Sequence, residues 1–255
     1  MSGRRLDPLI LAMHAVEYVP VRDDPNRLFI APRTLSSLVD RLKDKGYTFV
    51  TFGDMARAVA LGESAGLVSL TFDDGYRNNL YELVPIVQGR GVVATVFVAT
   101  GLLTKMHPDP PSRPMLTLDE VAVLHGEGVE IGCHTNTHRD LTRLDASEVT
   151  DELSTSKEAL EDVTQAPVEG LAYPFGDANK ETISLAKKAG FLAACRTSGR
   201  GSWSDLHDLP RQDVGNHPSA VGLELKRRDL YEPLMRFLPA RVARRVYYGV
   251  QKKVL

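Results

Sequence analysis

Short, almost wholly apolar runs separated by helical patterns constrain this chain more than any other feature of its sequence. Residues 92–99 are apolar at all positions except Thr95, and 67–72 has a similar character. Between such runs, apolar residues recur at helical spacing, as they do over 35–42. Continuous apolar strands flanked by helices are typical of a parallel sheet whose faces are covered by helices. The sequence therefore predicts an α/β fold in which strands and helices alternate.

The expected architecture is a barrel built from several strand–helix units. A chain of 255 residues suits one large α/β domain about as well as two small ones, and we prefer one. We place the barrel at 1–221 and a basic helical extension at 222–255. Further strands are expected at 9–13, 47–50, 129–131, 168–172 and 191–195, and helices at 54–61, 76–88, 117–124, 145–163 and 178–189. In such barrels the active face lies at the carboxyl ends of the strands.

Two adjacent carboxylates, Asp73 and Asp74, stand at the end of the predicted strand 67–72 and before Gly75. Neighbouring carboxylates repel each other, so the pair suggests a cation between them, or one metal ligand beside one proton carrier. The alternative is an ordinary turn, in which aspartate is favoured for its hydrogen bonds to the backbone.

Two histidines, His134 and His138, follow the predicted strand 129–131. We expect a spacing of four residues to place both imidazoles on one side of a helical turn, where they can reach one cation. With a carboxylate from Asp73 or Asp74 as third ligand, one position would stay open for water, as in catalytic zinc sites. Cobalt, nickel or manganese would suit the same ligands. The alternative is a pair of surface or capping histidines.

Three motifs in this order resemble the metal-dependent polysaccharide deacetylases of carbohydrate esterase family 4, the NodB-homology domain. They are TFDDG at 71–75, HTNTH at 134–138 and AYPFG at 172–176, and the resemblance covers most of the chain up to Val214. It implies a distorted (β/α)7-type barrel. It also implies that Asp74, His134 and His138 hold a divalent cation, most simply zinc, and that Asp73 is the general base that activates water.

The same resemblance assigns the backbone N–H of Phe175 to the stabilisation of the oxyanion. Many family members carry an arginine, which orients the base, at the position that Ala172 occupies here. Arg211, in the segment Leu-Pro-Arg at 209–211, resembles the corresponding segment of a subgroup with this form of the third motif. We assign Arg211 to the supporting role; the alternative is a surface ion pair.

The general acid is expected to be His14, at the end of the predicted strand 9–13. Its context is similar to the N-terminal strand of biofilm poly-N-acetylglucosamine deacetylases, in which the motif order is circularly permuted. The alternatives are a core histidine at this position, or His217 as the acid. We expect Cys133 to point into the core and away from His134.

The expected activity is metal-dependent hydrolysis of an N-acetyl group on an amino sugar, in a polysaccharide, a lipid-linked sugar or a small glycoside. The alternatives are another amide or cyclic-amide hydrolase on the same scaffold, or a catalytically silent carbohydrate-binding protein. The histidines His107, His125 and His207 are assigned to loops or the surface. Trp203 has two interpretations, stacking on a sugar ring or simple packing.

The overall charge excludes one class of partner, and its distribution suggests another. A formal net charge of −2 argues against a nucleic-acid-binding protein. The chain has two cysteines and lacks an apolar signal-peptide core, so the expected location is the cytoplasm. Over 222–255, nine basic residues stand against three acids in an amphipathic pattern. This tail either packs on the barrel or a neighbouring subunit, or docks peripherally on an anionic membrane. The oligomeric state is not predicted.

Overall fold

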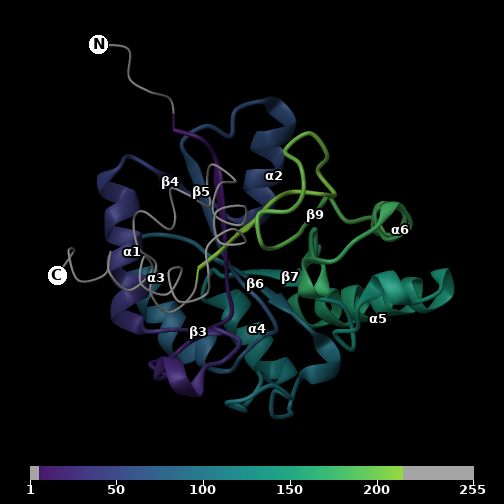
Figure 1. The fold of residues 1–255 in the computed structure, drawn as a ribbon, viewed down its shortest axis with the longest axis horizontal. Helices are drawn as coiled ribbons and strands as arrows, with labels where there is room; N and C mark the ends of the chain where they lie inside the picture. Colours follow the sequence, from purple (N-terminus) through teal and green to yellow (C-terminus); the bar gives the residue numbers. More distant parts are fainter. Residues whose placement is uncertain (1–5, 215–255) are drawn as a thin grey trace, which may run out of the picture.

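A parallel sheet, curled and surrounded by helices, organises residues 6–214, the part of the chain that the computed structural model describes (Figure 1). Its strand order is β10-β1-β5-β6-β7-β8-β9, and β4 pairs with the beginning of β5. The strands of this sheet are β1 Leu9–Met13, β4 Thr48–Phe49, β5 Leu67–Phe72, β6 Thr95–Val98, β7 Glu130–Cys133, β8 Gly170–Ala172, β9 Ala193–Cys195 and β10 Gln212–Asp213. A small second sheet pairs β2 (Ala15–Val16) with β3 (Phe29–Ile30). The predicted α/β barrel is confirmed.

A short segment after β9 joins the two edges of the curled sheet. Leu209 forms a parallel bridge with Cys195 of β9, and Gln212 of β10 pairs with Leu11 of β1. The segment 209–213 therefore spans the gap between the first and the last strands of the curl. Side chains of an extended segment alternate between its two sides, and in this segment the side chain of Arg211 is fully buried.

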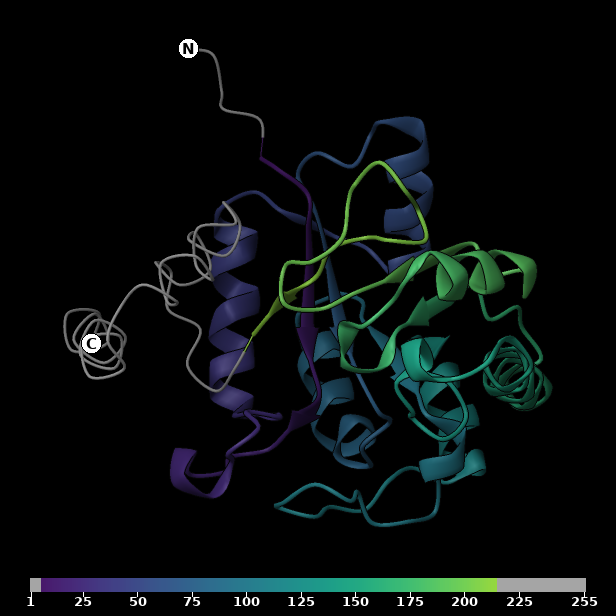
Figure 2. The same cartoon turned by 45° about the vertical axis from the view of Figure 1, so that its right-hand side comes forward.

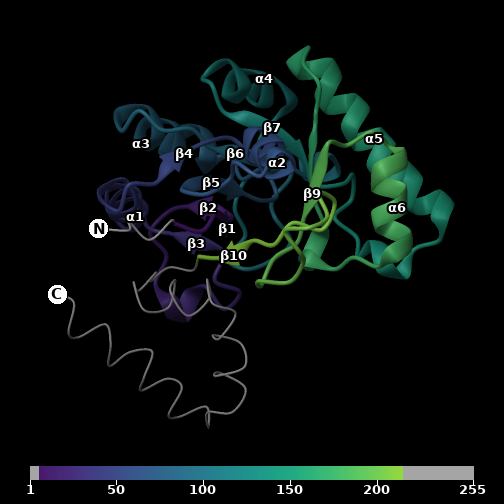
Figure 3. The same ribbon diagram turned by 90° about the horizontal axis from the view of Figure 1, so that it is seen from above.

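Helices cover the outside of the sheet and one of its ends. They are α1 Pro32–Asp44, α2 Phe52–Leu61, α3 Val84–Gly89, α4 Leu118–Gly126, α5 Ala146–Thr164 and α6 Lys180–Lys188. Figure 3 shows α1, α3, α4, α5 and α6 around the strands, whereas α2 lies near the middle. The Phe52 N–H at the start of α2 donates to Oγ1 of Thr95, the first residue of β6, at 2.9 Å. Helix α2 therefore covers the end of the barrel where the strands begin, and loops lie at the opposite end, where the strands finish (Figure 2).

Aromatic rings fill the interior above α2. Phe52 and Phe97 pack edge to face with their centroids 5.2 Å apart. Two strand glycines make room for them: a Cβ on Gly132 would lie 2.3 Å from the Phe97 ring, and one on Gly170 would lie 2.7 Å from the Phe52 ring. Pairing large with small side chains fills the interior to the density of a core, so this part of the barrel is not a channel.

Most helices and strands lie where the sequence predicts them. The capping box of Thr117 and Glu120 is present at the start of α4 and confirms that prediction. The helix predicted over 76–88 is present but begins later, and its first part, Asn79–Leu83, is a π-helix that leads directly into α3. Pro85 has no N–H to donate to the preceding turn, which favours such a widened turn.

Several predictions concern residues outside the described range. The basic extension at 222–255 and its membrane contact fall there, as does His217, so these stay predictions, and so does the cytoplasmic location. Within 6–214, no helix is both long and apolar enough to cross a membrane.

Candidate active site

The predicted site residues lie where the strands end, at the opposite end of the barrel from α2. Asp73 and Asp74 directly follow β5, and His134 directly follows β7. The neighbouring strand β1 ends at Met13, whose carbonyl accepts the Asp73 N–H at 2.9 Å, so His14 begins beside the two aspartates. Parallel strands thus bring residues far apart in the sequence to one edge of the sheet.

Asp74 and two histidines form a compact set of possible ligands. His134 Nε2 and His138 Nε2 each lie 3.4 Å from Oδ1 of Asp74, and the three atoms lie within 4.8 Å of one another. The Nδ1–H of His134 donates to the Ala172 carbonyl at 2.7 Å, which leaves the lone pair of Nε2 facing Asp74. Oδ1 of Asp74 is buried and accepts no hydrogen bond from any of residues 6–214.

These distances fit a divalent cation with four ligands. Bonds of about 2.0–2.1 Å in a tetrahedral site place neighbouring donor atoms about 3.3–3.4 Å apart, which matches both separations from Asp74 Oδ1. A buried carboxylate oxygen without a hydrogen bond is costly, and a cation would satisfy it. Two imidazoles and one carboxylate are also the donor set that zinc and neighbouring transition metals prefer.

The prediction of a helical turn at 134–138 is wrong. Thr135 and His138 both have positive φ, at 68° and 57°, and the segment has no helical hydrogen bonds. Its backbone bonds outward instead: the Thr137 N–H donates to Glu152 Oε2 at 2.7 Å, and the Thr135 carbonyl accepts from the Thr100 N–H at 3.2 Å. The two imidazoles therefore meet through an irregular loop that α5 and the segment after β6 hold in place.

The pKa shifts of Asp74 and His138 suit cation binding. Burial alone raises the pKa of the Asp74 carboxyl, but its close contacts with His107 and His134 outweigh burial and hold this pKa well below its usual range. Burial and the charge of His134 lower the pKa of His138 to about 4. Burial also lowers the pKa of His134, yet the charges of Asp73 and Asp74 raise it overall. The negative charges that raise the pKa of His134 would also attract a cation to this place.

Arg211 holds the other aspartate. It lies in the segment 209–213 and is fully buried, and its Nη1 and Nη2 each donate to one oxygen of Asp73 at 2.7 Å. Nη1 also donates to Oγ1 of Thr71 at 2.9 Å, and Nε donates to the Arg196 carbonyl at 3.0 Å. The guanidinium carbon Cζ also lies over the face of the Phe97 ring, 5.3 Å from the ring centroid. The contact that sequence reasoning proposed between Arg211 and the base position is therefore present.

The two aspartates consequently have different surroundings. Burial raises the pKa of Asp73, but the charges of Arg211 and His134 outweigh it, so the pKa lies below its ordinary value. Arg211 occupies both oxygens of Asp73, whereas Oδ1 of Asp74 has no such partner among the described residues. The guanidinium beside Asp73 therefore comes from the segment 209–213 and not from position 172, which is alanine.

His14 directly follows β1, at the level where Asp73 follows the neighbouring strand β5. Its side chain is half-buried, and its charge acts on Asp73, Asp74 and His138, so the imidazole lies within electrostatic reach of all three. The predicted acid thus lies beside the predicted base, at the ends of two neighbouring strands.

Phe175 adopts a backbone conformation that is rare for a large side chain. Its φ is 58° and its ψ is 4°, in the left-handed region. The ring is 56% exposed and packs edge-on against the His138 ring, with the centroids 4.9 Å apart. Arg200 holds this turn: its Nη2 donates to the Phe175 carbonyl at 2.7 Å, and Nη1 pairs with Asp177. The strained turn therefore lies at the mouth of the site.

One residue of the site was missed. His107, assigned from the sequence to a loop or the surface, is in a loop but only 4% exposed, and its Nε2 lies 3.2 Å from Oδ2 of Asp74. It stands in a proline-rich segment with no strand or helical pattern, so only the tertiary fold shows the contact. His125 and His207 are partly exposed, as expected, and Cys133 is buried in the core as predicted.

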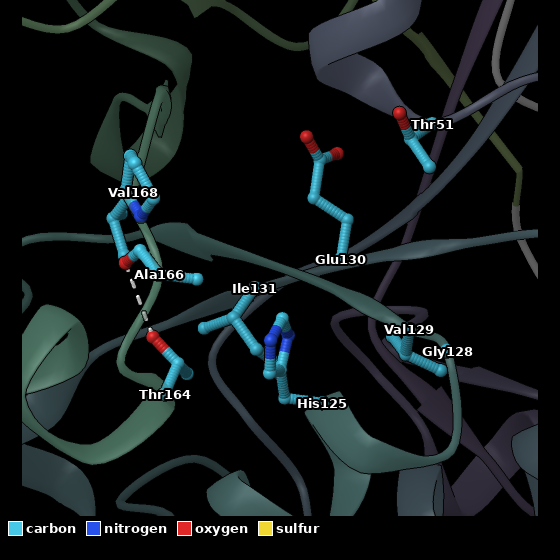
Figure 4. A pocket seen from close by; sticks show the side chains of 10 residues that line it. Thr51, His125, Gly128, Val129, Glu130, Ile131, Thr164, Ala166 and Val168 are labelled. Atoms are coloured by element: carbon cyan, nitrogen blue, oxygen red, sulfur yellow. Dashed lines mark hydrogen bonds between the residues drawn. The ribbon is translucent and has the colours of Figure 1, made fainter.

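A cavity elsewhere in the barrel does not belong to this site. It has a volume of about 220 Å³ and is lined by residues that include Thr51, His125, Glu130 and Val168 (Figure 4). Glu130 is the first residue of β7 and His134 follows its last, so the length of the strand separates the cavity from the ligand set. The cavity lies toward the end of the barrel that α2 covers.

A parallel barrel that brings an Asp–His–His set and a buried Asp–Arg pair to the carboxyl ends of its strands defines the class of carbohydrate deacetylases with the NodB fold. Comparison with family models agrees: residues 62–194, just over half of the chain, match the family described as polysaccharide deacetylase. The chain belongs to the polysaccharide deacetylase family, and the resemblance seen in the sequence is confirmed at this level.

Individual relatives support the same assignment. The putative polysaccharide deacetylase YxkH of Bacillus subtilis is 26% identical over 204 residues, which cover 77% of this chain and 70% of that protein. The chitooligosaccharide deacetylase of a Bradyrhizobium strain is 31% identical over 60% of this chain and 64% of its own length. The Streptococcus pyogenes deacetylase PplD, solved in complex with acetate, superposes with a TM-score of 0.75 at 26% identity and covers 88% of this chain and 99% of its own.

A more distant structural neighbour bears on the fold alone. IcaB from Ammonifex degensii superposes with a TM-score of 0.70 at 18% identity, over 88% of this chain and 97% of its own. The circular permutation expected from the context of His14 is not established by these comparisons and stays a prediction.

Proposed function

We propose that this protein hydrolyses the N-acetyl group of an amino sugar with the help of a divalent cation held by Asp74, His134 and His138. The observation that carries the proposal is the unequal environment of the two adjacent aspartates. Asp73 is held by Arg211 through both oxygens, whereas Oδ1 of Asp74 faces two imidazole nitrogens at 3.4 Å. One carboxylate is thus arranged as a base and the other as a ligand.

The spacing of the three ligand atoms favours zinc among the candidate cations, with cobalt, nickel and manganese as alternatives. When bound, such a cation would polarise the acetyl carbonyl and lower the pKa of a nearby water. The remaining steps are assigned to side chains and backbone groups of the chain itself.

Asp73 is the proposed general base. Its lowered pKa keeps it ionised at neutral pH, and its Oδ2 lies 4.0 Å from His134 Nε2, which places it at the edge of the ligand set. A carboxylate that accepts two hydrogen bonds from Arg211 retains lone pairs for a third. Asp73 would take a proton from the attacking water as its oxygen bonds to the acetyl carbon.

His14 is the proposed general acid. When the bond between the acetyl carbon and the sugar nitrogen breaks, the leaving amine needs a proton, and His14 follows β1 directly beside the position of Asp73. The products are then acetate and a free amino sugar. The backbone N–H of Phe175 is proposed to stabilise the negative charge on the carbonyl oxygen before this bond breaks.

The relatives support an N-acetylated carbohydrate as substrate. One of them is a chitooligosaccharide deacetylase, and the solved deacetylase from Streptococcus pyogenes holds acetate. The proposed substrates are polymers, lipid-linked precursors and small glycosides that carry an N-acetylated amino sugar.

The test combines metal analysis with a panel of N-acetylated sugars, nucleotide sugars and chito-oligomers, scored for acetate and for free amine. We expect His14→Ala and Asp73→Asn to keep the metal and lose most of the activity, and His134→Ala to lose both. Turnover by His14→Ala at the native rate would remove His14 from the mechanism. Amine release without acetate would contradict deacetylation and indicate opening of a cyclic amide.

A further inference from the structure

We propose that His107 is a positioning residue that holds Oδ2 of Asp74, so that Asp74 offers the cation a single oxygen, Oδ1. The proposal rests on the cation site of the proposed function and adds a residue outside the three sequence motifs. It concerns how Asp74 binds, and it assigns His107 no contact with substrate.

The hydrogen bonds of His107 fix which nitrogen carries the proton. The backbone N–H of Asp109 donates to Nδ1 of His107 at 3.1 Å. An N–H group can only donate, so Nδ1 must present a lone pair and the proton must be on Nε2. Nε2 lies 3.2 Å from Oδ2 of Asp74, close enough for this N–H to donate to the carboxylate. His107 acts here as a neutral imidazole with one donor and one acceptor, both in use.

The ring cannot easily turn away from Asp74. It stacks on the Tyr76 ring with centroids 4.8 Å apart and planes inclined by 27°, and Tyr76 in turn packs edge to face against Phe29 at 5.7 Å. The backbone of His107 is held as well: its N–H donates to the Arg113 carbonyl at 2.8 Å, and its carbonyl accepts from Ser112 Oγ at 2.7 Å. The proline-rich loop therefore delivers an imidazole in one fixed orientation.

The two oxygens of Asp74 are thus divided between two tasks. Oδ2 accepts from His107, and Oδ1 accepts no hydrogen bond from the described residues and faces His134 and His138. A hydrogen-bond partner behind a metal ligand fixes the orientation of the ligand, and its loss typically reduces metal affinity about 10–100-fold. Holding Oδ2 also disfavours binding through both oxygens, which suits a four-coordinate transition metal better than calcium with its six to eight oxygen ligands.

The experiment compares two substitutions that separate the donor from the ring. His107→Phe keeps a flat ring against Tyr76 and removes the donor. His107→Gln loses the ring, but its side-chain amide can place an N–H near the position of Nε2. His125→Phe, in α4 at the far end of the barrel, is the matched control. Each purified full-length protein is stripped of metal, its thermal unfolding is recorded, and its affinity for Zn²⁺ is measured by competition with a chromophoric chelator.

We expect His107→Phe to bind Zn²⁺ about 10–100-fold more weakly than the native protein, with His107→Gln and His125→Phe close to native. Native affinity in His107→Phe would overturn the proposal. Equal losses in the Phe and Gln variants would also overturn it, because the ring rather than the donor would then matter. If His107→Phe does not fold, native affinity in the Gln variant still supports the donor role and a loss there contradicts it. Failure of the native protein to bind Zn²⁺ would instead remove the cation site itself.

The visible spectrum of the cobalt-loaded proteins tests the single oxygen directly. Four-coordinate Co²⁺ absorbs much more strongly than six-coordinate Co²⁺. We expect the native and Gln variant proteins to share the strong absorption, and the Phe variant to lose intensity as Oδ2 becomes free to bind. An unchanged spectrum in the Phe variant would contradict the role of His107 in limiting Asp74 to one oxygen.

Discussion

Arg211 donates to both carboxylate oxygens of Asp73 at 2.7 Å, and both residues are buried. The arginine reaches the aspartate from the segment that bridges β9 and β1, far from β5 in the sequence. A fork of two parallel N–H groups fixes the plane of the carboxylate as well as its charge. The closure of the barrel and the orientation of the proposed base therefore depend on the same short segment.

Arg211→Lys should impair catalysis without emptying the cation site. A lysine keeps the positive charge but cannot form the two-pronged contact, so the orientation of Asp73 would be lost. We expect kcat/KM to fall by about 100-fold or more, the scale of a general base, with metal content unchanged. Steady-state kinetics with metal analysis checks this, and native kcat/KM in the variant would exclude an orienting role.

The same substitution has a consequence for the pH profile. Burial raises the pKa of Asp73, but the charge of Arg211, together with that of His134, outweighs it, and the pKa therefore lies below its ordinary value. The base works only when ionised, so weakening this contact should raise its pKa and move the acidic limb of the activity profile to higher pH. A limb that stays in place, with lower activity at every pH, would show that Arg211 supports the fold alone.

Much of this site could be predicted from the sequence because its ligands follow strands. Asp73, Asp74 and His134 each stand directly after an apolar run, and the carboxyl ends of parallel strands meet at one edge. The conformation of 134–138 could not be predicted, because Thr135 and His138 take positive φ only with partners from elsewhere in the fold. Spacing alone suggested a helix there.

His107 and Arg211 show what decides whether a distant residue can be found. Arg211 was proposed because its local segment resembles that of related enzymes. His107 lies in an irregular loop, so no periodicity marks it, and its burial against Tyr76 and Asp74 exists only in the folded chain. A contact that depends on tertiary packing alone leaves little trace in a single sequence.

Arg200→Ala should slow the chemical step more than it weakens substrate binding. Arg200 holds the carbonyl of Phe175 in a left-handed turn, and without it the turn can relax and move the Phe175 N–H that we propose to face the oxyanion. A shift of about 1 Å in such a group can cost up to about 100-fold in rate. We expect kcat to fall on this scale, with KM nearly unchanged.

Kinetics of Arg57→Ala provide the control for this variant. Arg57 also forms surface ion pairs, with Asp54 and Glu169, but in α2 at the far end of the barrel. It should keep native kcat. A fall in kcat of the same size in both variants would point to a general loss of surface ion pairs instead of a role for Phe175.

Glu130 gives a pH dependence of stability that is separate from catalysis. Burial raises the pKa of its carboxyl above the ordinary value of 4.5, although Thr95 and the N–H groups of Gly53 and Phe52 donate to it. A raised pKa in the folded state means that the contribution of the group is fully present below the pKa of the unfolded chain. It is lost as the pH rises through the folded-state pKa.

Glu130→Gln removes this titration and so isolates its effect. We expect the free energy of unfolding of the native protein to fall relative to that of the variant as the pH rises from 4 to 7. Urea unfolding of both proteins at several pH values measures the difference. A difference that is constant with pH, or that grows in favour of the native protein, would contradict the raised pKa.

Gly132→Ala should link packing in the barrel interior to the site above it. The new Cβ would lie 2.3 Å from the Phe97 ring, which is confined by Phe52 on one side and carries the Arg211 guanidinium on the other. Overpacking of this kind typically costs about 1–3 kcal/mol in the free energy of unfolding. Because the displaced ring supports Arg211, we also expect a lower kcat/KM.

Two further variants of this protein test whether the clash with Phe97 causes the effects of Gly132→Ala. Gly126→Ala, at the end of α4, has no atom within 4 Å of its new Cβ and should be neutral or slightly stabilising. Adding Phe97→Leu to Gly132→Ala frees space, so the alanine should cost less in that background than in the native one, and a double-mutant cycle from urea unfolding measures the coupling. If the two substitutions are additive, the clash with Phe97 is not the cause of the loss. If kcat/KM stays native while stability falls, the ring does not transmit the strain to Arg211 and Asp73.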